Sequence, residues 1–185
     1  MTVSELEAAP PSDYRILVPR DWFRVDLTKE RWRSQLKTFV DKEFAGSRTS
    51  AETSRTIWGA LRNTAEHGLS RGALEFFLRT EAPERATVPA SLLISWPPVS
   101  RGTAPTPDEL AGALAERAGP EAEVEVVGLP TGRTVRVRRE STLDYHVQMP
   151  GDTGYLHLAF SVPLSGTVGP MGRLLDAIAH SLRWV

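Results

Sequence analysis

The chain has 185 residues, a formal net charge of −1 and no cysteine. This length suits one domain that buries roughly 70% of its unfolded surface, so neither a metal nor a disulfide is needed for folding. The absence of cysteine excludes disulfides, thiolate metal sites and cysteine nucleophiles, and the near-zero charge excludes a general attraction to nucleic acid or anionic lipid. Only three of the 22 basic residues are lysine, which indicates a GC-rich, bacterial coding genome.

Residues 1–13 are small and acidic and contain Pro10-Pro11, so they predict a flexible tail before a single domain at 14–185. They have neither the basic nor the apolar region of a secretory signal peptide. No stretch approaches the ~20 apolar residues of a membrane span. We therefore expect a soluble, cytoplasmic protein.

The first half of the domain predicts two short strands and then two helices. The strands are Tyr14–Val18 and Trp22–Leu27, and Thr28 is a candidate N-cap for the first helix, which ends near Phe44. The second helix runs from Ser50 to about His67. Apolar side chains recur along each at the spacing of one helical face: Trp32, Leu36, Phe39, Val40 and Phe44, then Ile57, Leu61, Ala65 and Leu69.

The middle of the chain changes to strand patterns. Ala73–Arg79 and Val88–Trp96 are rich in apolar and β-forming residues. Thr106 then caps a third helix, with a proline in the first turn and Glu109 placed for a capping box. This helix should end near Ala118, before Gly119-Pro120.

Four strands with clean alternation follow, joined by short loops that make an antiparallel meander, and a last helix closes the chain. We expect one face of the meander to be dry. The strands are Glu121–Val127, Thr134–Arg139, Leu143–Met149 and Tyr155–Val162, the helix is 170–182, and the expected dry face carries Val135, Val137, Tyr145, Val147, Leu156, Leu158 and Phe160. Strand runs with helices grouped against them indicate an α+β fold with an antiparallel sheet.

Loop lengths also predict the strand register. A Gly128–Arg133 loop sets Glu125 opposite Arg136 and Glu123 opposite Arg138. Counting back from the Pro150–Gly154 loop sets His146 opposite His157.

Two glycine-containing segments resemble catalytic motifs. Gly68-Leu-Ser70-Arg-Gly72 matches the serine-hydrolase pattern, but a helix precedes it and a strand follows, which is the reverse of a nucleophile elbow. Gly166–Gly172 lies between a strand and a helix, a context suited to phosphate, but its spacing fits neither nucleotide-binding fingerprint. We interpret the first as a helix stop and the second as a surface loop.

Three residues are candidate partner contacts: Trp58, off the main stripe of its helix, and the opposed pair His146 and His157. The histidine pair could share a metal, but no further ligand is nominated, so we expect a wet polar face that binds no metal. The arginines at 133, 136, 138 and 139 lack interleaved aromatic residues, so we expect them to pair with carboxylates rather than with RNA.

The sequence contains no recognisable catalytic arrangement or cofactor-binding motif, so we expect that the protein is not an enzyme and binds no cofactor. The favoured hypothesis is a binding or accessory protein that acts through contact with a protein partner. Two alternatives stay open: a carrier of a small ligand or lipid, with its cavity between sheet and helices, and an enzyme with an unrecognised site. The sequence indicates neither the partner nor the oligomeric state.

The opening Tyr14-Arg-Ile-Leu-Val-Pro-Arg-Asp-Trp22, a strand followed by Pro and Trp, resembles the start of Mog1/PsbP-like domains. The late Gly154-Tyr-Leu-His-Leu-Ala-Phe-Ser-Val-Pro163, followed by a terminal helix ending Ser181-Leu-Arg-Trp184, resembles their close. The resemblance covers the order of elements over most of the chain, except for the long helix pair after Leu27. It implies an α/β/α or α+β sandwich around an antiparallel sheet, a non-enzymatic binding role and no catalytic residue to transfer.

Overall fold

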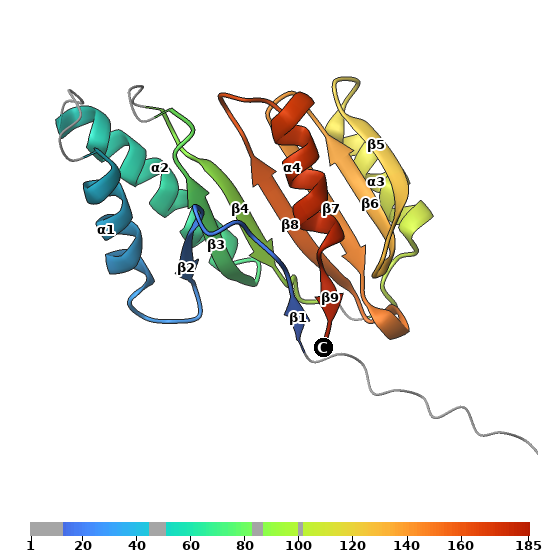
Figure 1. Ribbon diagram of the computed structural model, residues 1–185. Coiled ribbons are helices and arrows are strands. Elements are labelled where there is room, and N and C mark those ends of the chain that lie inside the picture. Colours follow the sequence, from blue (N-terminus) through green and yellow to red (C-terminus); the bar gives the residue numbers. More distant parts are fainter. Residues whose placement is uncertain (1–12, 45–50, 83–86, 100–101) are drawn as a thin grey trace, which may run out of the picture.

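A computed structural model describes residues 13–44, 51–82, 87–99 and 102–185. A seven-stranded antiparallel sheet has the strand order β2-β3-β4-β8-β7-β6-β5, and helices pack on both of its faces (Figure 1). The predicted α+β class with an antiparallel sheet is therefore confirmed. Among the described helices, none has the length and hydrophobicity needed to cross a bilayer.

The element bounds match most of the predicted ones to within a few residues. They are β1 (Tyr14–Arg15), β2 (Phe23–Asp26), α1 (Trp32–Phe44), α2 (Ala51–Leu69), β3 (Ala73–Arg79), β4 (Ala90–Ser95), α3 (Pro107–Ala118), β5 (Glu123–Leu129), β6 (Gly132–Arg138), β7 (Thr142–Gln148), a short 3₁₀ turn (Pro150–Asp152), β8 (Tyr155–Ser161), α4 (Gly169–His180) and β9 (Arg183–Trp184).

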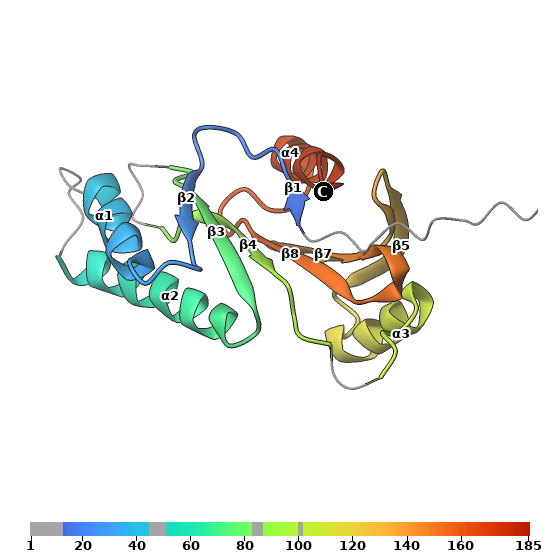
Figure 2. The same cartoon turned by 90° about the horizontal axis from the view of Figure 1, so that it is seen from below.

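Each face of the sheet has its own apolar core. Helix α4 covers one face, which we call the α4 face (Figure 2). There Leu175, Ile178 and Leu182 pack on side chains such as Leu158 and Phe160. On the opposite face α1 and α2 form a second core with β2 and β3, and α3 lies against β5 and β6. The sheet is therefore the middle layer, with an uneven helix layer on either side.

The expected dry face is wrong in one respect. Val135 pairs with His146, and Val137 pairs with Asp144, so both valines lie on the face opposite to α4. Tyr145 pairs with Arg136 and shares the α4 face with it. The reason is the tight β6–β7 turn, which pairs Arg138 with Leu143 and so puts the arginines of β6 in phase with the apolar residues of β7.

The predicted pairings within the meander are confirmed. Glu125 lies opposite Arg136, Glu123 lies opposite Arg138, and His146 lies opposite His157. The β5–β6 strands are longer than predicted and continue through the pair Leu129 and Gly132. A two-residue turn therefore replaces the expected six-residue loop without changing the register.

The helix starts were predicted unequally well. At α3, Thr106 Oγ1 accepts the Glu109 amide at 3.3 Å and Glu109 Oε2 accepts the Thr106 amide at 2.9 Å, as the capping box predicts. Thr28 is not an N-cap, because its hydroxyl and amide both bind Asp26 Oδ1 and α1 begins only at Trp32. The predicted start at Ser50 lies outside the described residues.

The two ends of the domain pair with each other. Strand β1 is antiparallel to β9, and Asp13 exchanges backbone hydrogen bonds with Val185 at 3.0 and 3.3 Å. This pairing was not predicted from the sequence. Asp13 therefore belongs to the folded domain, whereas residues 1–12 of the predicted tail lie outside the described residues.

Candidate functional site

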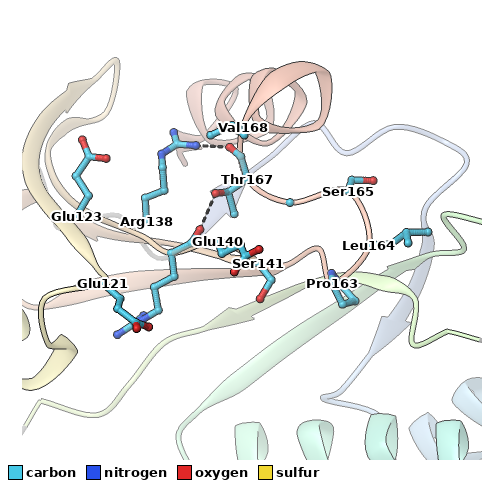
Figure 3. Close-up of a pocket in the computed structure, with 12 residues that line it drawn as sticks. Glu121, Glu123, Arg138, Glu140, Ser141, Pro163, Leu164, Ser165, Thr167 and Val168 are labelled. Atoms are coloured by element: carbon cyan, nitrogen blue, oxygen red, sulfur yellow. Dashed lines mark hydrogen bonds between the residues drawn. The ribbon is translucent and has the colours of Figure 1, made fainter.

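A hollow of about 690 Å³ opens at one end of the sheet, beside the N-terminus of α4 (Figure 3). Three segments form it: the residues that lead into β5, the β6–β7 turn (Arg139–Ser141) and the loop between β8 and α4, which we call the β8–α4 loop (Pro163–Val168). Its lining is Glu121, Glu123, Arg138, Arg139, Glu140, Ser141, Pro163, Leu164, Ser165, Gly166, Thr167 and Val168.

The buried end of the β8–α4 loop is held by the β6–β7 turn. Thr167 is 1% exposed; its amide donates to the Glu140 carbonyl at 3.0 Å and its hydroxyl donates to the Arg139 carbonyl at 2.6 Å. The Arg138 guanidinium donates to the Thr167 carbonyl (Figure 3). All the polar groups of Thr167 are therefore satisfied, which fixes this part of the loop.

The exposed end of the loop is held by one carboxylate. Glu81 accepts the Leu164 amide at 3.1 Å, the Ser165 amide at 3.2 Å and the Ser165 hydroxyl. Hydrogen bonds to a charged acceptor are the stronger kind. The β8–α4 loop is thus pre-formed at both ends.

The glycines of the Gly166–Gly172 segment have backbone roles. Gly166 and Gly169 have φ values of +73° and +72°, which favour glycine. A Cβ on Gly172 would lie 2.8 Å from the Thr167 carbonyl carbon and closer still to its oxygen. In addition, Pro170 removes one free amide from the first turn of α4. These features support the interpretation of a surface loop over a phosphate site.

The loop presents apolar side chains to solvent. Val168 is 71% exposed and Leu164 is 38% exposed. A second hollow of about 390 Å³ is also bordered by Val168 and Ser165; its other lining residues are Arg79, Pro170, Met171 and Leu174. The β8–α4 loop is therefore a ridge between two hollows, with apolar side chains on its crest.

The charges of the first hollow are unevenly paired. Arg138 lies 3.7 Å from Asp176, and Arg139 lies 3.8 Å from Asp144, two carboxylates outside the lining. In the described part of the chain, no cation lies within ion-pair distance of the three glutamates in the lining, Glu121, Glu123 and Glu140. The unpaired charge of the hollow is consequently negative.

The four arginines of the predicted basic stripe do not form one surface. Arg136 binds Glu125 at 2.5 Å across the hairpin and Arg138 lies near Asp176 of α4, both on the α4 face. Arg133 binds Asp108 of α3 at 3.0 Å and Arg139 approaches Asp144, both on the other side. Each arginine therefore has a carboxylate nearby, as expected, although only Arg136 finds its partner across the hairpin.

The two candidate histidines are neighbours, as the predicted register requires, and both side chains are half-buried. Their rings stack with centroids 4.4 Å apart and planes inclined by 7°. His157 Nε2 lies 2.8 Å from Asp144 Oδ1. Burial, with the neighbouring His157 charge as a second cause, lowers the pKa of His146 to about 3. The rings are partly covered because they share their face with Val135 and α3 packs on the adjacent strand.

No group of three or more His, Asp or Glu side chains in the described segments is arranged to hold a metal ion. Trp58 is half-buried and packs against the core between α1, α2 and the sheet. None of Trp58, His146 and His157 lines the hollow. Sequence reasoning missed the β8–α4 ridge, and the one signal that pointed to this segment was its glycine pattern.

Ser70 lies in a turn between a helix and a strand, as the sequence context of its motif predicted. It lies just after α2, exposed, and its hydroxyl donates to the His67 carbonyl at 2.6 Å. Gly72 makes the turn into β3 with a φ of +84°, and a Cβ there would lie 3.0 Å from the Trp96 carbonyl carbon. The motif therefore serves as a helix stop and a tight turn.

Comparison of the chain with protein-family models, with curated proteins and with solved structures found no match. The Mog1/PsbP-like resemblance therefore stays a prediction that rests on the residues quoted above.

Proposed function

We propose that this protein is a non-enzymatic accessory module that binds a protein partner through the β8–α4 ridge. The observation that carries the proposal is the combination of exposed Leu164 and Val168 with a loop whose backbone is already fixed. Apolar side chains presented on a pre-formed backbone are suited to binding, because little conformational entropy is lost when a partner docks.

The location of the hollow supports this module over a carrier. A carrier needs a cavity between the sheet and its helices, whereas the 690 Å³ hollow lies between loops at the end of the sheet. The position of Ser70 also gives a hydrolase little support, because its hydroxyl bonds to a backbone carbonyl rather than to a base. A cytoplasmic site of action is part of the proposal.

Affinity capture from the native cells, followed by mass spectrometry, tests this function. The chain carrying both Leu164→Asp and Val168→Asp is compared with the wild type and with Leu17→Asp, a control at an apolar residue that is 76% exposed. We expect at least one protein to be captured by the wild type and the control and lost with the double variant. Unchanged capture by a double variant with a wild-type melting curve would contradict the proposal.

A further inference from the structure

Three carboxylates around the hollow are exposed, and no cation of the described residues lies within ion-pair distance of them. Glu121 lies just before β5, Glu123 is its first residue, and Glu140 comes from the β6–β7 turn. The fold brings these two segments to the same hollow. Such a hollow attracts a cationic group and repels an anionic one.

The two arginines of the hollow do not offset this preference. Arg138 has a side chain that is 18% exposed, donates to the Thr167 carbonyl and lies near Asp176. Arg139 is directed toward Asp144 on the adjacent strand. Both guanidinium groups therefore have acceptors within the protein, whereas the three glutamates are solvated and their charges are not offset by a close cation in the described residues.

One side of the hollow carries apolar side chains. Pro163, Leu164 and Val168 of the β8–α4 loop line it, and Figure 3 shows Pro163 and Leu164 on the side away from Glu121 and Glu123. Long basic side chains combine an aliphatic stem with a charged end, so a Lys or Arg can lie along such a side and still reach a carboxylate. An apolar neighbour in the same segment would pack on Leu164 and Val168.

We propose that the hollow binds a segment of a partner protein in which a Lys or Arg adjoins an apolar residue. This inference rests on the proposed function and adds the chemistry of the partner. The basic side chain lies among Glu121, Glu123 and Glu140, and the apolar residue covers the crest of the ridge. An acidic or phosphorylated segment is disfavoured by the same three carboxylates.

Selection from a random peptide library on the intact protein tests this chemistry without knowledge of the partner. The library is selected on the wild type and depleted on the triple variant Glu121→Gln, Glu123→Gln, Glu140→Gln. We expect the enriched peptides to carry Lys or Arg beside Leu, Ile, Val or Phe. Enrichment of acidic peptides, of peptides without a charge preference, or of none would overturn the inference.

An enriched peptide is then synthesised and its affinity measured by fluorescence anisotropy. Removing one exposed ion pair weakens binding by about 1.4- to 5-fold, so the triple variant should bind about 3- to 125-fold more weakly. Glu116→Gln, an exposed glutamate of α3 outside the hollow, should bind like the wild type. Equal affinities for the wild type and the triple variant would overturn the inference.

The two proposals fail differently. If Leu164→Asp with Val168→Asp abolishes partner capture but the triple glutamine variant captures the partner normally, the ridge binds a partner of other chemistry and only this inference is wrong. If the Leu164 and Val168 changes leave capture intact, the proposed function itself is wrong.

Discussion

His146 shows how strand register can half-bury a polar side chain. It lies opposite His157 on β8 and opposite Val135 on β6, on the face where α3 packs on the adjacent strand. Burial disfavours the charged imidazolium, which is why the pKa of His146 falls to about 3. Since the sequence shows only alternating polar residues here, neither the burial nor the ring stacking could be predicted from it.

This lowered pKa predicts a pH-dependent stability. The unfolded chain binds the His146 proton below its ordinary pKa of 6.5, whereas the folded chain does not bind it until the pH approaches 3. The free energy of unfolding should therefore fall as the pH drops through this window, by up to about 1.4 kcal/mol per pH unit from this group.

The measurement is urea unfolding of the wild type and of His146→Gln at several pH values between about 6.5 and 4, which gives the free energy of unfolding at each pH. The wild type should lose more stability than the variant as the pH falls, while His67→Gln, at an exposed position on α2, should follow the wild type. A His146→Gln variant that loses as much stability as the wild type would show that His146 is not buried in its neutral form.

Replacing Gly172 should lower the stability of the fold, because the Thr167 backbone lies close to its Cα. A Cβ there would lie 2.8 Å from the Thr167 carbonyl carbon, so Gly172→Ala must displace the β8–α4 loop. Overpacking of this kind costs about 1–3 kcal/mol. Gly112→Ala, in α3 with no atom within 4 Å of the added Cβ, should instead stabilise by about 0.4–1 kcal/mol. Thermal unfolding of both variants measures these stability changes. A Gly172→Ala variant as stable as the wild type would contradict the close approach of Gly172 to the Thr167 backbone.

Among the structural elements, the features that depend on residues close in sequence were predicted best. The α3 capping box and the Glu125–Arg136 pairing depend on residues close in sequence, and both are present in the structure. The β1–β9 pair is different, because two strands of two residues each carry no periodicity. The β8–α4 loop shows the same limit: its anchor Glu81 is 83 residues from Leu164, and no motif connects them.

Glu81 predicts a local change in hydrogen exchange. In Glu81→Ala, the Leu164 and Ser165 amides lose their acceptor, so both should exchange at least roughly tenfold faster. The Thr167 amide bonds to the Glu140 carbonyl instead and should keep its protection, which makes it an internal control. Unchanged exchange at Leu164 and Ser165 would mean that Glu81 does not hold the loop.

For the whole molecule, the sequence predicted the class and the meander but not the site. The pairing of β4 with β8 joins distant parts of the chain, and no loop length in the sequence predicts it. The hollow is formed by the β5 entry, the β6–β7 turn and the β8–α4 loop, which share no pattern. The candidates chosen from the sequence, Trp58, His146 and His157, were selected for residue type, and all three are at least half-buried in the fold.

Photo-cross-linking in the native cells tests the central claim, that the β8–α4 ridge contacts a protein partner, most directly. A photoreactive amino acid is placed at Val168 and, as the control, at Leu17, both highly exposed. The account predicts a discrete protein adduct from Val168, lost when Leu164→Asp is added, and no such adduct from Leu17. No adduct from Val168, or the same adduct from both positions, would contradict it.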